Sequence, residues 1–320
     1  MSAGGGSKAV IAALMANLGI AVTKFLAWLL TGSSSMLAEA IHSVADSGNQ
    51  GLLLLGDKRA RREATVLHQF GYGRERYVYS FVVAIVLFSV GGLFALYEGW
   101  HKVHEPHAIE SWHWVPVAVL VASIVMEGFS FRTAIAESNK IRGGMSWPHF
   151  IRSARSPELP VVLLEDFAAL TGLVLALVGV VLTIATGNGV YDGLGSMTIG
   201  ALLVLVAIFL AIEMKSLLIG ESATVESQRR IEDAIATAPG VERLIHCKTL
   251  HVGPEEVLVA AKFGVAPTDA ASDVAAAIDA AERAVREAEP TAAHIYLEPD
   301  IYRTSYTPAD RPAVPDTPSH

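Results

Sequence analysis

Long apolar runs constrain this chain more than any other feature of its sequence. A helix of about 20 apolar residues crosses the roughly 30 Å hydrocarbon layer of a bilayer. Several runs of this length follow one another along the 320 residues. Only 18% of the residues are charged, against about a quarter in soluble chains. The sequence therefore predicts an α-helical polytopic membrane protein.

The apolar runs predict six membrane spans. They lie at 9–30, 36–55, 78–99, 114–135, 160–186 and 195–218. The connections 31–35 and 187–193 are so short that we expect the first two spans and the last two spans to form hairpins. These spans make up a predicted transmembrane domain over residues 1–220.

Basic residues predict how the chain is oriented. The connections 56–76 and 136–159 hold six and four Lys or Arg residues, whereas 31–35 and 187–193 hold none. Because basic loops stay in the cytoplasm, we expect both termini there. The first residues resemble neither a transit peptide nor a cleavable signal. This favours a bacterial plasma membrane but leaves a mitochondrial inner membrane open.

The larger share of charged residues after residue 220 predicts a soluble domain over 221–300. Its expected order is helix 225–238, strands 244–252 and 256–265, helix 271–289 and strand 292–299. This αββαβ order is typical of a ferredoxin-like fold. The Pro-rich segment 301–320 is predicted to be a disordered tail. A single cysteine, Cys247, excludes a disulfide framework and a Cys-rich zinc site.

Two polar residues in the second predicted span suggest a metal site. His42 and Asp46 are four residues apart, so a helix places them on one face about 6 Å apart at Cβ. An imidazole nitrogen and a carboxylate oxygen can close on one ion at this spacing. The alternative is that they hydrogen-bond each other to stabilise helix packing. We favour the metal because ionisable groups inside a membrane are costly and usually functional.

One helix cannot complete a tetrahedral site, and the fifth predicted span carries Glu165 and Asp166. Adjacent helical positions differ by about 100°, so both cannot point at one ion. One is a candidate ligand, and the other a proton carrier or a buried partner for Lys24. The alternative is that this span begins later and both acids lie at the cytoplasmic surface. Glu127 in the fourth span is a candidate packing or proton-relay acid.

Several stretches together resemble one transporter family. They are GSSSMLAEAIHSVADSGNQ (32–50), HQFGYGRERYVYSF (68–81), VVLLEDFAAL (161–170), YDGLGS (191–196) and HVGPEEVLVAAKFGV (251–265). The sequence resembles the cation diffusion facilitator family of metal/proton antiporters, and within it the zinc transporter 9-like branch. The resemblance implies six helices, a cytosolic ferredoxin-like domain, a homodimer and alternating access.

The resemblance also implies ligands. The family's second-span HxxxD falls on His42 and Asp46. In its fifth-span HxxxD the Asp falls on Asp166, but the His position is Val162, which leaves Glu165 or a water as the fourth ligand. A second, loop-located family site matches only at His68. We do not expect metal in the cytosolic domain.

These observations predict a secondary active transporter that exports a divalent cation in exchange for protons. One nitrogen and several oxygens suit Zn²⁺, while Mn²⁺, Fe²⁺ and Co²⁺ remain open. We expect no resident cofactor and no nucleic-acid partner. An enzyme is disfavoured because the sequence shows no nucleophile–base pair and no phosphate loop. A channel and a membrane-anchored metal-responsive scaffold are the remaining alternatives.

Overall fold

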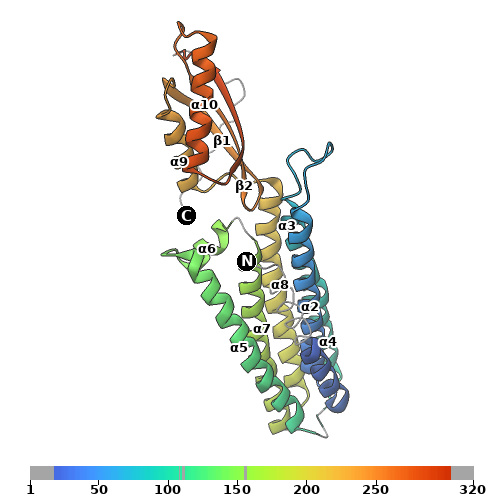
Figure 1. Cartoon of the computed structure of the whole chain (residues 1–320). Coiled ribbons are helices and arrows are strands. Elements are labelled where there is room, and N and C mark those ends of the chain that lie inside the picture. The colour runs from blue at the N-terminus through green and yellow to red at the C-terminus, as the bar shows by residue number, and fades with distance from the viewer. Residues whose placement is uncertain (1–17, 108, 110–111, 155–156, 304–320) are drawn as a thin grey trace. The chain divides into compact units, whose positions relative to one another are not determined.

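A computed structural model describes residues 18–107, 109, 112–154 and 157–303. The chain folds into two compact units: the first comprises the residues up to Gly220 together with Val252–Glu255, and the second comprises Glu221–His251 and the residues from Glu256 onward. The first unit is helical, and the second combines helices with a small sheet (Figure 1). Most of the predicted tail, from residue 304 onward, and the start of the first span, up to residue 17, lie outside the described residues.

Most of the first unit is helical. Its helices are Leu18–Thr31, α2 (Ser34–Ala60), α3 (Glu75–Val86), the π-helical segment η1 (Leu87–Leu93), α4 (Phe94–His104), α5 (Trp114–Arg142), α6 (Trp147–Ser153), α7 (Glu158–Thr186) and α8 (Val190–Ile219). The segments α3, η1 and α4 follow one another without a break.

Four of the described helices are long and apolar enough to cross a membrane. They are Glu75–His104, Trp114–Arg142, Glu158–Thr186 and Val190–Ile219, which correspond to predicted spans three to six. The predicted class, a polytopic helical membrane protein, is confirmed. With 27 residues α2 is also long enough, but it is less apolar than these four because several of its residues are polar.

The helices extend beyond the predicted spans. The helix that carries the last span begins at Val190, so Tyr191, Asp192 and Gly193 are helical and not part of an irregular connection. The region 136–159 is not a plain loop, because it contains the end of α5, the short helix α6 and the start of α7. Polar residues near helix ends masked both extensions in the sequence.

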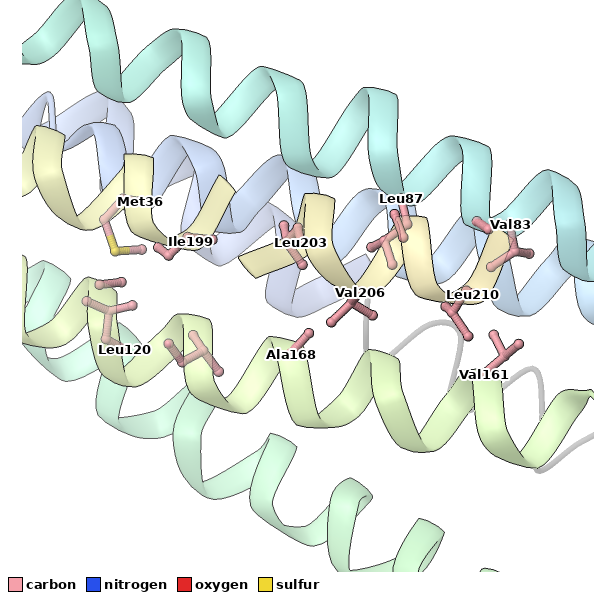
Figure 2. Packing of buried hydrophobic residues seen from close by; sticks show 14 of the residues in the cluster. Met36, Val83, Leu87, Leu120, Val161, Ala168, Ile199, Leu203, Val206 and Leu210 are labelled. Carbon is pink, nitrogen blue, oxygen red and sulfur yellow. The ribbon is translucent and has the colours of Figure 1, made fainter. Parts of the chain in front are cut away.

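The apolar core of this unit is built around α8. Its buried residues recur three or four positions apart, the spacing of one helix face: Ile199, Leu203, Val206 and Leu210. Figure 2 shows this face with Val83 and Leu87 on one side and Val161 and Ala168 of α7 on the other. The central helix thereby holds α3, η1 and α7 in fixed positions.

Glycines bring α4 and α8 into backbone contact. A Cβ atom added at Gly99 would lie 2.6 Å from the carbonyl oxygen of Gly193, and one at Gly200 would lie 2.6 Å from the nitrogen of Leu96. Real Cβ atoms do not come this close to backbone, so both positions require glycine. Small residues allow such close crossings of membrane helices.

The N-terminal end of α2 is capped by a residue from α8. The Asp192 carboxylate is fully buried and accepts hydrogen bonds from the Ser33 hydroxyl (2.9 Å), the Ser34 amide (2.7 Å) and hydroxyl (3.2 Å), and the Ser35 amide (3.2 Å). Amide groups at a helix start lack partners within the helix, and a carboxylate satisfies them well. This contact fixes where α2 begins.

The second unit has the predicted αββαβ order. Its elements are α9 (Val225–Ala236), β1 (Arg243–Gly253), β2 (Glu256–Gly264), α10 (Ala271–Ala288) and β3 (Ala292–Asp300). The sheet order is β1-β2-β3, and β2 pairs with β3 in parallel with Val259 opposite Ile295. A buried apolar cluster that includes Ile231, Phe263 and Val285 joins the helices to the sheet.

Candidate metal centre

A stripe of buried polar side chains runs along α2. Its members are spaced three, four and three residues apart, which is one face of a helix: Glu39, His42, Asp46 and Asn49. All four belong to the buried class, and His42 is only 1% exposed. We call these four residues the α2 stripe. It contains both ligands that the second predicted span supplied.

His42 and Asp46 lie together, as the sequence predicted. The Nδ1 atom of His42 is 3.5 Å from Oδ1 of Asp46, beyond the usual 2.7–3.2 Å of a nitrogen–oxygen hydrogen bond. Within the described chain, neither ring nitrogen of His42 has a hydrogen-bond partner, and Oδ1 of Asp46 has none either. The geometry therefore speaks against a simple packing hydrogen bond between the two. Their role as ligands stays a prediction.

Glu165 reaches the α2 stripe from α7. Its Oε1 atom accepts a hydrogen bond of 2.7 Å from the Asn49 side-chain amide. The carboxyl groups of Glu165 and Asp46 also lie close enough to interact. Because α7 begins at Glu158, Glu165 lies two turns inside the helix and is buried. The alternative that this span begins later, with both acids at the surface, is wrong.

Asp166 points to a different helix. Its Oδ2 atom accepts a hydrogen bond of 2.9 Å from the hydroxyl of Ser130 on α5. Half-buried Glu127 on the same helix is close enough to interact electrostatically with Asp166 and His42. The structure thus brings Glu165, rather than Asp166, to the pair on α2. Asp166 remains a predicted ligand that this conformation does not place beside the other two.

The four predicted ligands are therefore only partly assembled. Nowhere in the described chain do three His, Cys, Asp or Glu side chains form a group that could hold a metal ion. His42, Asp46 and Glu165 lie at the interface of α2 and α7. Asp166 lies at the interface of α7 and α5.

Sequence reasoning missed Glu39. Lys24, for which an acid of the fifth predicted span was a candidate partner, instead pairs with Glu39. Its Nζ atom lies 3.0 Å from Oε2 of Glu39 and 2.8 Å from the Ser43 hydroxyl. Lys24 and Glu39 are both almost completely buried. The available signal was spacing, because Glu39 precedes His42 by three residues in the same apolar run.

A second ion-pair network joins the other end of α2 to α3 and α7. The guanidinium of Arg76 on α3 lies 2.9 Å from Oδ1 of Asp57 and 2.7 Å from Oε1 of Glu158. Arg76 belongs to the GYGRERY motif, which thereby gains a structural role. The network links the two helices that carry the α2 stripe and Glu165.

The remaining candidates lack the features of a site. His68 packs against Tyr72, with ring centroids 4.6 Å apart and the rings tilted by 59°, and is exposed to solvent. In the second unit, burial and the nearby Glu232 raise the pKa of the Cys247 thiol to about 11. The expectation of no metal in the cytosolic domain stays a prediction.

Known proteins share this architecture and these motifs. Residues 10–219 match the model of the cation efflux transmembrane domain. The chain belongs to the cation efflux family, also called the cation diffusion facilitators. This confirms the family that the sequence motifs indicated.

Individual relatives support the same conclusion. The chain is 36% identical to the mitochondrial proton-coupled zinc antiporter SLC30A9 of Homo sapiens over 251 residues, 78% of this chain and 44% of that protein. It is 32% identical to metal tolerance protein C4 of Arabidopsis thaliana over 77% of this chain and 54% of that protein. It is 25% identical to the cation-efflux pump FieF of Pectobacterium atrosepticum over 77% of both chains. The chain thus spans about half the length of the first two relatives.

Proposed function

We propose that this member of the cation efflux family is a secondary active transporter that exports Zn²⁺ from the cytoplasm in exchange for protons. One observation carries the proposal. His42 and Asp46 present buried nitrogen and oxygen atoms that lack hydrogen-bond partners in the described structure, on a helix inside a membrane domain. A divalent cation satisfies such atoms, and the zinc antiporter among the relatives supports Zn²⁺ as the cargo.

Protons and metal compete for the same atoms in this mechanism. Coordination needs a neutral His42 and ionised carboxylates, so metal binding releases protons. The carboxyl groups of Asp46 and Glu165 lie close together, so they can share one proton, which an arriving cation displaces. Protons that return from the acidic side then displace the cation. Proton flow in one direction thereby drives metal in the other.

The donor set also bears on which metal is carried. Val162 stands where the family pattern has a second histidine, so the donor set is one imidazole nitrogen with carboxylate oxygens. This donor set is harder than one with two histidines. Harder oxygen ligands favour harder ions. We therefore rank Zn²⁺ first and Mn²⁺, Fe²⁺ and Co²⁺ next. Competition among these ions in a flux assay decides the order.

Replacing Asp46 by alanine tests the proposal. In proteoliposomes with a pH gradient, Asp46→Ala should abolish both metal uptake and metal-dependent proton movement. Ser47→Ala, on the neighbouring position of the same helix, is the matched control and should transport normally. Full metal-coupled proton movement in Asp46→Ala would show that the site is wrong.

The same assay separates the rival functions. A channel would pass metal at a rate that ignores the pH gradient. A membrane-anchored scaffold would show no flux even as the full-length chain. Only an antiporter couples a metal gradient to proton movement with a fixed ratio.

Assembly and location are part of the proposal. We infer a homodimer in a bacterial plasma membrane, with both termini in the cytoplasm. The basic residues of 56–76 and 136–159 support the orientation. The family resemblance supports the dimer. Light scattering of the detergent-solubilised protein measures the mass, and labelling of single introduced cysteines from each side of the membrane measures the orientation.

A further inference from the structure

The α2 stripe offers more atoms to a cation than the metal site needs. Four consecutive members each carry a buried atom without a hydrogen-bond partner in the described residues: Glu39 Oε1, both ring nitrogens of His42, Asp46 Oδ1 and Asn49 Oδ1. Buried polar atoms are rarely left without partners, so each needs an explanation. His42 and Asp46 are accounted for by the proposed metal site. Glu39, one turn away, is not.

The free oxygen of Glu39 faces a gap on α7. A Cβ atom added at Gly172 would lie 3.2 Å from Glu39 Oε1, so only the missing side chain of this glycine leaves room there. Gly172 follows Glu165 by seven residues, two helical turns along the same face. The α7 face opposite the stripe therefore has Glu165 beside Asp46 and Asn49, and Gly172 beside Glu39. Both buried carboxylates lie between α2 and α7.

The other oxygen of Glu39 is held by a positive charge. Lys24 Nζ lies 3.0 Å from Oε2 and also donates to the Ser43 hydroxyl. Lys24 is 1% exposed and Glu39 is fully buried. Like charges repel strongly at short range in a weakly polar interior. A divalent cation that reaches Oε1 is therefore attracted by the carboxylate and repelled by the ammonium.

We propose that Glu39 is a second, weaker subsite for the transported cation, next to the His42–Asp46 site, and that Lys24 keeps it weak. The proposal rests on the transport function proposed above. A cation passes between the sites by exchanging Asp46 for Glu39 while His42 stays in reach of both. Glu39 and His42 are three residues apart on the helix, within the range of neighbouring side chains.

The position of Glu39 makes it part of a path. From Asn49 to Glu39 the helix rises by about 15 Å, half of the roughly 30 Å hydrocarbon layer. In the predicted orientation the Glu39 end of α2 faces the outside, so Glu39 is the exit subsite. Conduction requires sites that bind well enough to admit an ion and weakly enough to release it. The ammonium of Lys24 supplies the second condition.

Steady-state transport by single variants tests this inference. Glu39→Gln should lower kcat about tenfold, which is about 1.4 kcal/mol, and leave the high-affinity binding of one Zn²⁺ per chain unchanged in equilibrium dialysis. Lys24→Gln should lower both kcat and KM, because the exit subsite then holds the cation too tightly. Glu39→Asp keeps the carboxylate and should recover most of the rate.

A double variant covers the case in which unpaired charges prevent folding. Lys24→Gln with Glu39→Gln keeps a buried hydrogen-bonding pair without charge. If the pair is only structural, this variant folds and transports with the wild-type kcat, which would overturn the inference. If Glu39 is the exit subsite, the variant folds and stays slow. A normal rate in Glu39→Gln alone, measured per folded protein, would overturn it as well.

The outcome also distinguishes this inference from the proposed function. If Asp46→Ala is inactive and Glu39→Gln is normal, the metal site stands and the exit subsite falls. If Asp46→Ala is fully active, the transport site itself is misplaced, and the exit subsite falls with it.

Discussion

Two buried polar clusters lie along α2, and their hydrogen bonding differs. At the N-terminal end, Asp192 of α8 receives four hydrogen bonds from Ser33, Ser34 and Ser35. Farther along the helix, each residue of the α2 stripe keeps an oxygen or nitrogen for which the described residues provide no hydrogen-bond partner. Both clusters are buried to a similar degree.

The difference separates structure from function. A fully hydrogen-bonded buried cluster stabilises one arrangement of helices, whereas an incompletely bonded one costs stability and persists for another reason. In the transport function proposed above, the cation supplies that reason. Substitutions at Asp192 should therefore affect folding, and substitutions in the α2 stripe should affect transport.

The largest expected effect is on transport by His42→Ala. Removal of a ligand should lower the flux by more than the roughly 10–100-fold that substitutions around a metal site cost. The thermal midpoint without metal should not fall, because the lost nitrogens have no hydrogen-bond partner in the described chain. Flux assays and thermal melts in detergent measure the two quantities. A large loss of stability with normal flux per folded protein would show that His42 has a structural role and not a role in transport.

Asp192→Asn should act in the opposite way. The amide replaces one accepting oxygen by a donor that faces other donors, so we expect a loss of about 2–4 kcal/mol in unfolding free energy. Flux per folded protein should stay near the wild-type value. Ser196→Ala is the matched control, because its hydroxyl makes only a long contact of 3.4 Å to the Ser35 hydroxyl. An unchanged thermal midpoint in Asp192→Asn would contradict the assignment.

Added Zn²⁺ should raise the thermal midpoint only of proteins that keep the metal site. Zn²⁺ at 100 times its dissociation constant stabilises a folded protein by about 2.7 kcal/mol. We expect this rise of the thermal midpoint in the wild type and in Asp192→Asn, but not in Asp46→Ala. Mg²⁺ serves as the control ion. A rise in Asp46→Ala equal to that of the wild type would place the binding site elsewhere.

The smallest expected effect is that of Gly172→Ala. The new methyl group would lie 3.2 Å from Glu39 Oε1, which must move by a few tenths of an ångström. We expect transport to slow about threefold, close to 0.6 kcal/mol, with little change in the thermal midpoint. Gly128→Ala is the control, because no other atom lies within 4 Å of its added Cβ. Equal rates in the two variants would remove Gly172 from the path.

Local patterns predicted much of the fold and half of the site. Helical spacing placed His42 and Asp46 on one face of α2, and the αββαβ order of the second unit followed from periodicity and turn residues. Both depend on residues close together in the chain. The apolar flanks of Glu165 and Asp166 likewise indicated that α7 begins before them.

Local sequence patterns could not predict the contacts between distant segments. Asp192 lies 158 residues from Ser34, and nothing near it in the sequence shows that it caps another helix. Lys24 had several acids as possible partners, and only the packing of the first helix on α2 selects Glu39. The direction in which Asp166 points depends on where α5 lies. Side-chain partners across a helix bundle follow from tertiary packing rather than periodicity.

The glycine contacts between α4 and α8 restrict how the helices of the first unit can move. Helices that slide past one another usually do so through small shifts of interlocking side chains. Where Gly99 and Gly200 bring two backbones together, no layer of side chains exists that could adjust. Close backbone contact at these glycines therefore opposes any sliding of α4 along α8.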